Sequence, residues 1–281
     1  MTSLMWAVAD SAVVAKKNLI KIKRVPEVLV WVLMSPIMFV LLFVYVFGSS
    51  IDIPGVPYRE WLIAGIFAQT VVFGATFTGA GIADDMSKGI IDRFRSLPMS
   101  RSAVLAGRTA SDVVYNVLSV GIMALTGLVV GWRVHTSPME IVGGFLLLLL
   151  FSYAFSWVMA YIGLLVPSVE VINNASFMVI MPLTFISNAF VPLENLPGPL
   201  RTFAEWNPVS AVTQAVRELF GNMPSAEVIS GLQASGIDVA SPSGAWSLQN
   251  PVLYTLIWIG IILAVFVPLS VRQYRRATTK M

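Results

Sequence analysis

The most charged interruption between the apolar runs of this 281-residue chain extends from Asp84 to Arg108, with the sequence DDMSKGIIDRFRSLPMSRSAVLAGR. It holds five Lys or Arg residues and three Asp residues, and long apolar runs precede and follow it. Charges gathered in a short polar stretch between apolar runs favour contact with another macromolecule. We therefore predict that this loop faces the cytoplasm and receives force from a partner protein, as a contact site rather than a catalytic one.

The motifs of common catalytic and metal sites are missing from the sequence. It contains no GxxxxGK[ST] phosphate loop for ATP hydrolysis, no HExxH pattern and no nucleophile elbow. It contains no cysteine, which excludes disulfides and thiolate metal sites. Its one histidine, His135, is expected as a solvated residue of an outer loop. We predict that the chain is not an enzyme, has no metal site and binds no cofactor itself.

The composition is that of a membrane protein. The chain is 57% hydrophobic and 12% charged, whereas soluble domains are about one quarter charged. Several apolar runs exceed the roughly 18 residues that can span a bilayer. The predicted fold class is an all-α polytopic membrane protein with six transmembrane helices, and the net charge of +3 does not indicate a nucleic-acid partner. The amino terminus lacks the pattern of a cleaved signal peptide, so the first apolar run is expected to remain as an anchor.

The predicted elements follow from the apolar runs and the turn residues between them. Residues 1–25 are expected to form an N-terminal interfacial amphipathic helix. Residues 26–271 form the six-span domain, and residues 272–281 form a basic tail. The spans are predicted at about 26–47, 59–83, 110–132, 139–166, 174–191 and 251–271, with the charged loop at 84–108 and an extracellular segment at 192–250. The small residues of the second span place it inside the bundle, and Pro182 is expected to break the fifth.

The distribution of Lys and Arg predicts the orientation. Six spans place both termini on one side, and that side would hold fourteen Lys and Arg residues against four on the other. Basic residues accumulate in cytoplasmic segments of membrane proteins. We predict a multi-pass protein of the cell membrane, with both termini and the 84–108 loop in the cytoplasm.

The charged loop contains a short helical pattern that ends at Pro98. Apolar residues recur at three-residue spacing (Ile91, Phe94 and Leu97), and Arg93 and Arg95 lie off that stripe. Two interpretations remain open from spacing. The helix could insert into a groove of a partner and pair its arginines with acids there, or it could anchor charges at the membrane interface.

The stretch from residue 192 to 222 is punctuated by four prolines. Apolar residues between them predict two short amphipathic helices that are broken at Asn207-Pro208. Each is too short to span a bilayer. They are expected on, or partly within, the outer leaflet, where protein must shield their backbone polar groups.

These features together resemble the permease subunits of ATP-binding-cassette type-2 exporters, and they are most similar to the actinobacterial daunorubicin/doxorubicin-resistance type. The resemblance covers nearly the whole chain. The residues that carry it are the Lys17-to-Pro26 lead-in, the loop pattern Asp84…Gly89…Arg93…Leu97-Pro98…Arg101, and the motif residues Leu196, Pro197, Asn207, Pro208 and Arg217.

The resemblance implies roles that the residue pattern leaves open. It implies that residues 91–99 form a coupling helix on a nucleotide-binding subunit, and that the outer stretch forms short re-entrant helices. The ATPase-coupling residues would be Ile91, Asp92, Arg93, Phe94, Arg95, Ser96, Leu97 and Pro98. The implied partners are two ATPase subunits, which would hold ATP and Mg, and a second permease that is an identical copy or a paralogue.

Polar and bulky side chains within the spans suggest a pathway for the substrate, because polar groups in lipid usually face the bundle interior. The candidates are Gln69, Thr70, Phe73, Phe177, Met178 and Asn188. Hydrogen bonds between helices and contact with lipid are the alternative roles. Asp112 is expected to pair with Arg108, four residues before it.

The sequence thus predicts the membrane-spanning subunit of an ATP-driven exporter for a hydrophobic or amphiphilic drug or lipid. A glycan-exporting permease of the same superfamily is one alternative. An ATP-independent channel or secondary carrier is another, and the absence of ionisable residues in the middle of the predicted spans disfavours ion coupling.

Overall fold

The structure is a computed structural model of the whole chain, and it describes residues 34, 37–47, 53–90, 101–166, 168–193, 196–224, 226–235 and 244–277. Within these ranges every regular element is a helix, which agrees with the predicted all-α class. The predicted interfacial helix at 1–25, much of the first span and the coupling residues 91–98 lie outside the described residues.

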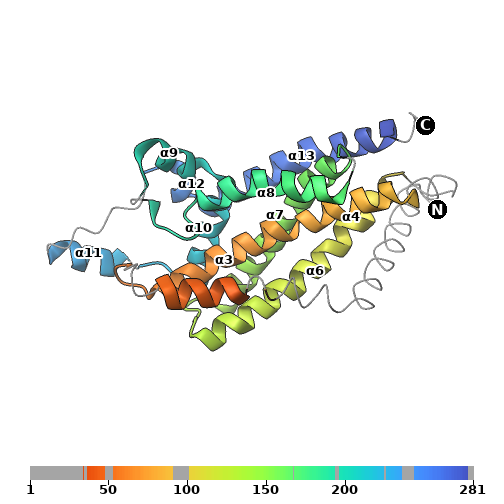
Figure 1. Cartoon of the computed structure of the whole chain (residues 1–281). Helices are drawn as coiled ribbons and strands as arrows, with labels where there is room; N and C mark the ends of the chain where they lie inside the picture. Colours follow the sequence, from red (N-terminus) through yellow and green to blue (C-terminus); the bar gives the residue numbers. More distant parts are fainter. Residues whose placement is uncertain are drawn as a thin grey trace.

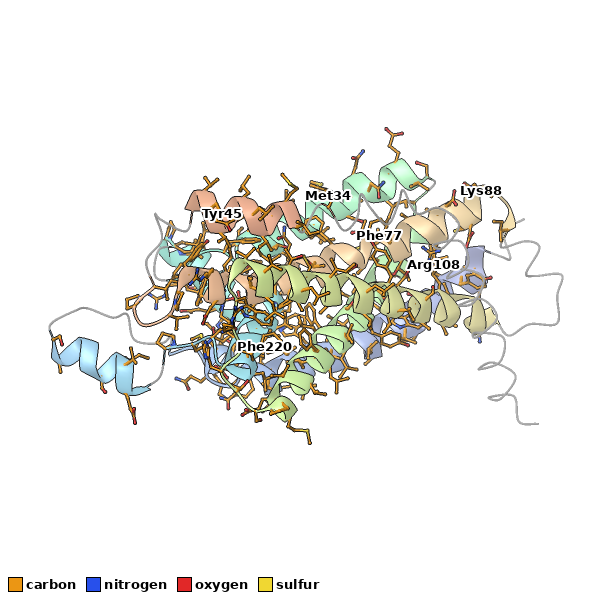
Figure 2. The ribbon with its side chains drawn as sticks, turned by 90° about the horizontal axis from the view of Figure 1, so that it is seen from below. Met34, Tyr45, Phe77, Lys88, Arg108 and Phe220 are labelled. Atoms are coloured by element: carbon orange, nitrogen blue, oxygen red, sulfur yellow. The ribbon has the colours of Figure 1, made fainter. Side chains whose placement is uncertain are left out.

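The helices form an elongated bundle (Figure 1). In chain order they are η1 (Phe43–Phe47), α3 (Tyr58–Gly74), α4 (Thr76–Ser87), α6 (Arg101–Val130), α7 (Pro138–Gly163), α8 (Val169–Phe185), α9 (Gly198–Trp206), α10 (Pro208–Phe220), α11 (Ala226–Ala234), α12 (Trp246–Gln249) and α13 (Pro251–Ala277). The helices α9, α10 and α12 gather at one end of the bundle, here called the α10 end. The end of α4 and the start of α6 lie at the opposite end, here called the Lys88 end (Figures 1 and 2).

In the part of the chain that the structure describes, four helices are long and apolar enough to cross a membrane: Tyr58–Ser87, Leu105–Val130, Pro138–Gly163 and Pro251–Arg276. They correspond to the predicted second, third, fourth and sixth spans. Two shorter apolar helices, Ile37–Val46 and Val169–Phe185, lie where the first and fifth spans were expected.

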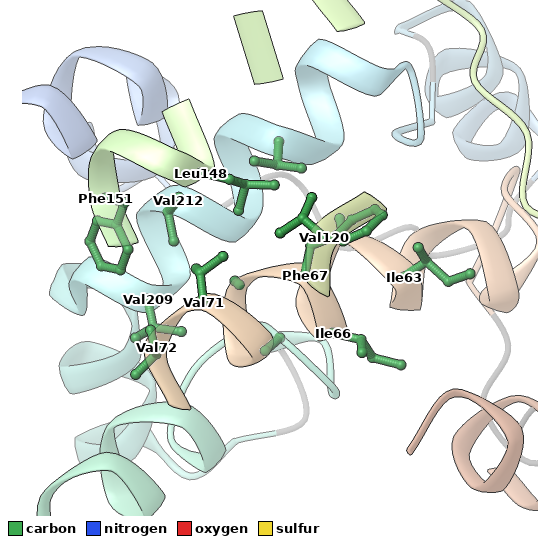
Figure 3. Packing of buried hydrophobic residues seen from close by; sticks show 14 of the residues in the cluster. Ile63, Ile66, Phe67, Val71, Val72, Val120, Leu148, Phe151, Val209 and Val212 are labelled. Atoms are coloured by element: carbon green, nitrogen blue, oxygen red, sulfur yellow. The ribbon is translucent and has the colours of Figure 1, made fainter. Parts of the chain in front are cut away.

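The Tyr58–Ser87 span is the central element of the bundle. Within its most apolar window 83% of the residues are buried, against 22% for Pro251–Arg276 at the periphery. This confirms the prediction that the second span is interior. Its aromatic and aliphatic side chains, among them Phe67 and Val71, pack against α6, α7 and α10 in a continuous apolar core (Figure 3).

Glycines permit the close approach of α4 and α7. A Cβ atom at Gly163 would lie 2.5 Å from the Gly79 carbonyl oxygen, and one at Gly79 would lie 2.7 Å from the Met159 carbonyl oxygen. Such distances leave no room for a side chain, so the two backbones are in direct contact. Backbone contact through small residues is a common way to pack membrane helices without an apolar driving force between them.

Several helix bounds differ from the predicted spans. The third helix begins at Arg101 rather than near residue 110, because its charged first turns are helical although they are too polar for a hydropathy window. The last helix continues to Ala277, beyond the predicted 271. The fifth runs from Val169 to Phe185 rather than over 174–191, and Pro182 lies inside it. The expected break at Pro182 was wrong, since the helix passes through this proline and ends three residues later.

Candidate functional site

The helix α8 is short for a membrane span, and it ends where its last carbonyl groups need hydrogen-bond donors from elsewhere in the protein. Its 17 residues are about 25 Å long at 1.5 Å per residue, against about 30 Å of hydrocarbon. The described residues between Phe185 and Gly198 contain no α-helix. Carbonyl groups at and beyond the helix end therefore lack helical partners, and unpaired carbonyl groups are costly in an apolar environment.

Asn207 satisfies two of these carbonyl groups. Its Nδ2 donates to the Leu183 oxygen at 2.6 Å and to the Ile186 oxygen at 2.8 Å. Its Oδ1 accepts from Val209 N at 2.8 Å and thereby caps α10, and Pro208 occupies the first helical position. Asn207 thus joins the end of α8 to the start of α10 and explains the break between the two short helices.

From inside α10, Arg217 donates to two further carbonyl groups of this segment and to one carbonyl group of α3. Its Nη2 donates to the oxygens of Asn188 at 2.7 Å and Ala189 at 3.2 Å, and its Nε donates to the Trp61 oxygen at 2.9 Å. The side chain is fully buried, with its guanidinium carbon 3.4 Å from the centre of the Trp61 ring. Burial lowers the pKa of Arg217, whereas the carbonyl oxygens and the ring stabilise its charged form.

Asn207 and Arg217 form what we call the carbonyl clamp, which holds the segment after α8 against α3 and α10. Gly65 makes the same contact possible from α3, because a Cβ there would lie 1.9 Å from the Ala189 oxygen. The two other motif residues stand just before α9: Leu196 N donates to the Leu193 oxygen, and Pro197 precedes the first residue of the helix. The sequence motif therefore has a structural basis in the fold.

The predicted pathway residues occupy different environments. Gln69 and Thr70 are buried on α3, and the Thr70 hydroxyl donates to the Ile66 carbonyl of its own helix. Phe73 and Phe177 do meet, edge to face between α3 and α8, with ring centres 5.6 Å apart. Met178 is 82% exposed on α8.

Asn188, the last predicted pathway residue, lies in the segment that the clamp holds. Its backbone N–H is outside any helix and donates to Ser210 Oγ at 3.1 Å. Its Nδ2 donates to Gln214 Oε1 at 3.2 Å. With its carbonyl held by Arg217, Asn188 is bound to α10 at three points. The structure therefore brings a predicted pathway residue together with the re-entrant motif.

A second polar group lies between α4 and α6, towards the Lys88 end. The buried carboxylate of Asp112 accepts a short hydrogen bond from Thr78 Oγ1. Arg108 Nε lies 3.7 Å from Asp112 Oδ2, which confirms the predicted pair, and Arg108 Nη2 donates to the Phe77 oxygen at 2.8 Å. Asn116 Nδ2 donates to the Asp112 backbone oxygen at 2.9 Å. Because the helix extends back to Arg101, Asp112 lies deeper in it than the predicted span implied.

His135 was expected as a solvated loop residue, and the structure gives it a partner. Its Nε2 lies 2.9 Å from Glu60 Oε2 on α3, while its side chain remains 56% exposed. Its backbone N donates to the Phe220 oxygen at the end of α10. The loop thus links α3 to α10. No sequence signal identified this pair, because the two residues are 75 positions apart.

The described residues contain no group of three or more His, Cys, Asp or Glu side chains that could hold a metal ion.

Comparison with known proteins identifies the family. A family model described as ABC-2 type transporter matches residues 11–220. The chain is 31% identical over 253 residues to the daunorubicin resistance ABC transporter permease protein DrrB1 of Streptomyces coeruleorubidus, covering 90% of this chain and 81% of the relative. The chain therefore belongs to the ABC-2 type transporter family, as the resemblance predicted.

Two relatives of lower sequence identity are also named as permeases. The chain is 23% identical to the probable doxorubicin resistance ABC transporter permease protein DrrC of Mycobacterium tuberculosis, over 74% of this chain and 67% of the relative. It is 26% identical to the putative transport permease ycf38 of Cyanophora paradoxa, over 75% of this chain and 73% of the relative. All three relatives are named as permeases, and their names describe transport components rather than enzymes.

Proposed function

We propose that this chain is the membrane-spanning subunit of an ATP-driven exporter for a hydrophobic or amphiphilic drug or lipid. The observation that carries the proposal is a helical membrane bundle of the ABC-2 type transporter family whose own sequence has no phosphate loop. Such a bundle needs a separate subunit to hydrolyse ATP. Its relatives with daunorubicin and doxorubicin resistance in their names support a lipophilic drug as substrate.

The proposed assembly contains two copies of a nucleotide-binding ATPase, which would hold ATP and Mg, and a second permease that is identical or paralogous. The two ATPase subunits would close on ATP, and residues 91–98 would transmit that movement to α4 and α6, the helices that flank them. The Lys88 end would then face the cytoplasm with both termini. The excess of Lys and Arg in the segments at that end supports this orientation.

The α10 end would lie at the outer leaflet, with α9 and α10 as short helices that dip into it. The carbonyl clamp supports this placement, because non-helical backbone at membrane depth persists where protein satisfies its polar groups. Asn207 and Arg217 do this for four carbonyl groups at and beyond the end of α8, those of Leu183, Ile186, Asn188 and Ala189. Phe73, Phe177 and Met178 on α3 and α8 would contribute to the wall of the pathway.

Co-expression with phosphate-loop ATPases from the same genome tests the proposal. The two proteins are expected to co-purify in detergent, and the Phe94→Ala/Arg95→Ala double variant is expected to lose binding or the stimulation of ATP hydrolysis. A Phe203→Ala variant at the α10 end provides the matched control. If the double variant retains full binding and stimulation, residues 91–98 are not the docking site.

A further inference from the structure

One face of α6 carries a row of polar side chains. Arg108, Asp112, Tyr115, Asn116 and Ser119 are separated by four, three, one and three residues, which places them on one side of an α-helix. Asp112, Tyr115, Asn116 and Ser119 are each less than one tenth exposed. We call these five residues the α6 polar stripe.

The other faces of the same helix turns are apolar and exposed. Val114, Val117 and Leu118 are 41%, 46% and 46% exposed. A membrane helix is expected to turn such side chains towards lipid. Beyond Ser119 the buried side of α6 becomes apolar as well, with Val120 and Met123 in the core. The polar stripe therefore begins near the Lys88 end and stops inside the bundle.

The hydrogen-bonding capacity of the stripe is not filled by protein. Asn116 Oδ1 is buried, and no hydrogen-bond donor of the described residues reaches it. The Nε of Arg108 is likewise buried, and its 3.7 Å separation from Asp112 exceeds hydrogen-bonding distance. Buried polar atoms without protein partners in a native protein are usually satisfied by water or a ligand.

The contact between α4 and α6, which covers the stripe, is of a kind that can admit water or a ligand. The helix α4 is in backbone contact with α7 through Gly79 and Gly163, but it is joined to α6 by the side chains of Thr78, Asp112 and Arg108. Ala75, which joins α3 to α4, directly follows Gly74, the glycine that faces Asn116. Side chains can reorient without breaking a backbone contact, so this seam can open more readily than the seam between α4 and α7.

We propose that the α6 polar stripe is a water-accessible track that receives the polar head of an amphiphile from the Lys88 end. The track is about 16 Å long from Arg108 to Ser119, roughly half of the hydrocarbon thickness. A head group with hydrogen-bond donors, such as an amine, matches the Asp112 carboxylate and the free Asn116 oxygen. The ring of Tyr115, a member of the stripe, pairs with that of Phe77 on α4, with ring centres 5.4 Å apart, and offers an aromatic surface for the apolar part of the amphiphile.

The absence of cysteine from the natural sequence permits a direct test of water access. Single variants Ser119→Cys and Val117→Cys, two residues apart on opposite sides of α6, are reconstituted in lipid vesicles and treated with a membrane-impermeant cationic thiosulfonate. Ser119→Cys is expected to react roughly tenfold faster than Val117→Cys, because a thiol in lipid forms little thiolate. Equal modification rates for the two variants would show that the α6 polar stripe is not accessible to water, and would contradict the proposal.

The second arm tests the head group, which is the part that rests on the proposed exporter function. Dodecylamine is expected to slow the modification of Ser119→Cys several-fold, and dodecane is expected to leave it unchanged. If neither slows it, the track admits water only, and the assignment of an amphiphile is wrong. Neither arm uses ATP or an ATPase, so failure here is distinguishable from failure of the co-purification with an ATPase.

Discussion

Arg217 and Arg108 are both arginines enclosed by membrane-protein helices, but their environments differ. Arg217 is fully buried, donates to three carbonyl oxygens and lies over the Trp61 ring. Arg108 retains 15% side-chain exposure, donates to one carbonyl oxygen and leaves its Nε without a hydrogen bond. The hydrogen bonds of Arg217 are made to protein groups on α3 and in the segment after α8. Arg108 keeps one buried nitrogen atom that no described residue hydrogen-bonds.

This difference suggests how structural and functional polar groups can be separated in a membrane protein. A buried polar group with all of its partners stabilises one conformation, and removing it leaves those partners unsatisfied. A buried polar group with free capacity stabilises the fold less and remains available to water or a ligand. The carbonyl clamp is of the first kind, and the α6 polar stripe is of the second.

The largest effect is expected for Arg217→Leu. The substitution leaves the Asn188 and Ala189 carbonyl groups without this donor and also removes the bond to the Trp61 oxygen, at a cost of roughly 3 kcal/mol or more in the free energy of unfolding. Thermal unfolding of the detergent-solubilised protein measures it. Arg201→Leu is the matched control, since Arg201 forms a partly exposed pair with Glu205 and is expected to contribute less than about 1 kcal/mol. Similar unfolding temperatures for both variants would contradict the role of the clamp.

A smaller loss is expected for Gly163→Ala, which tests the tight seam between α4 and α7. The new Cβ would lie 2.5 Å from the Gly79 oxygen, so the helices must separate at a cost of about 1–3 kcal/mol. Gly143→Ala on the same helix meets no atom within 4 Å and should be neutral or stabilising. If both substitutions behave alike, the backbone contact is not a constraint.

Two substitutions of Asn207 separate its capping of α10 from its hydrogen bonds to α8. Asn207→Ala removes both the cap of α10 and the donor to α8, whereas Asn207→Ser retains an oxygen that can cap the helix. The alanine variant is therefore expected to be less stable than the serine variant by about 1 kcal/mol. Chemical denaturation of the two variants in the same detergent measures the difference, and equal stabilities would indicate that the cap contributes nothing.

The smallest effect on stability is expected for Asp112→Asn in the polar stripe. The amide oxygen can still accept from Thr78, so the free energy of unfolding should change by less than about 1 kcal/mol. Transport, in contrast, should fall clearly if the carboxylate receives the head of the substrate. A stability loss as large as that of Arg217→Leu would place Asp112 with the structural polar groups and remove the contrast between the two regions.

The sequence allowed the prediction of those features that depend on local pattern. Apolar runs identified the four long helices, and the Asn207-Pro208 pair identified the boundary between α9 and α10, because capping and proline geometry act within a few residues. The pair of Arg108 and Asp112 followed from its four-residue spacing. Family resemblance added the membership that the comparisons establish.

Other features depend on contacts between distant residues and were missed. Arg217 meets Trp61 across 156 positions, so its burial could not be read from its own neighbourhood. Asn188 resembled a pathway residue because it is polar, but its partners come from α10. The start of α6 was placed too late, since a hydropathy window does not recognise helical turns that carry Arg101 and Arg108.

Under the proposed function, this chain moves a lipophilic substrate only when a separate subunit hydrolyses ATP. The most direct measurement is ATP-dependent accumulation of doxorubicin in inside-out vesicles that contain the chain with or without its partner ATPase. We predict accumulation that requires ATP, the ATPase and this chain together, and that is abolished by Phe94→Ala/Arg95→Ala. Accumulation at an equal rate without ATPase or ATP, driven by an ion gradient, would contradict the account.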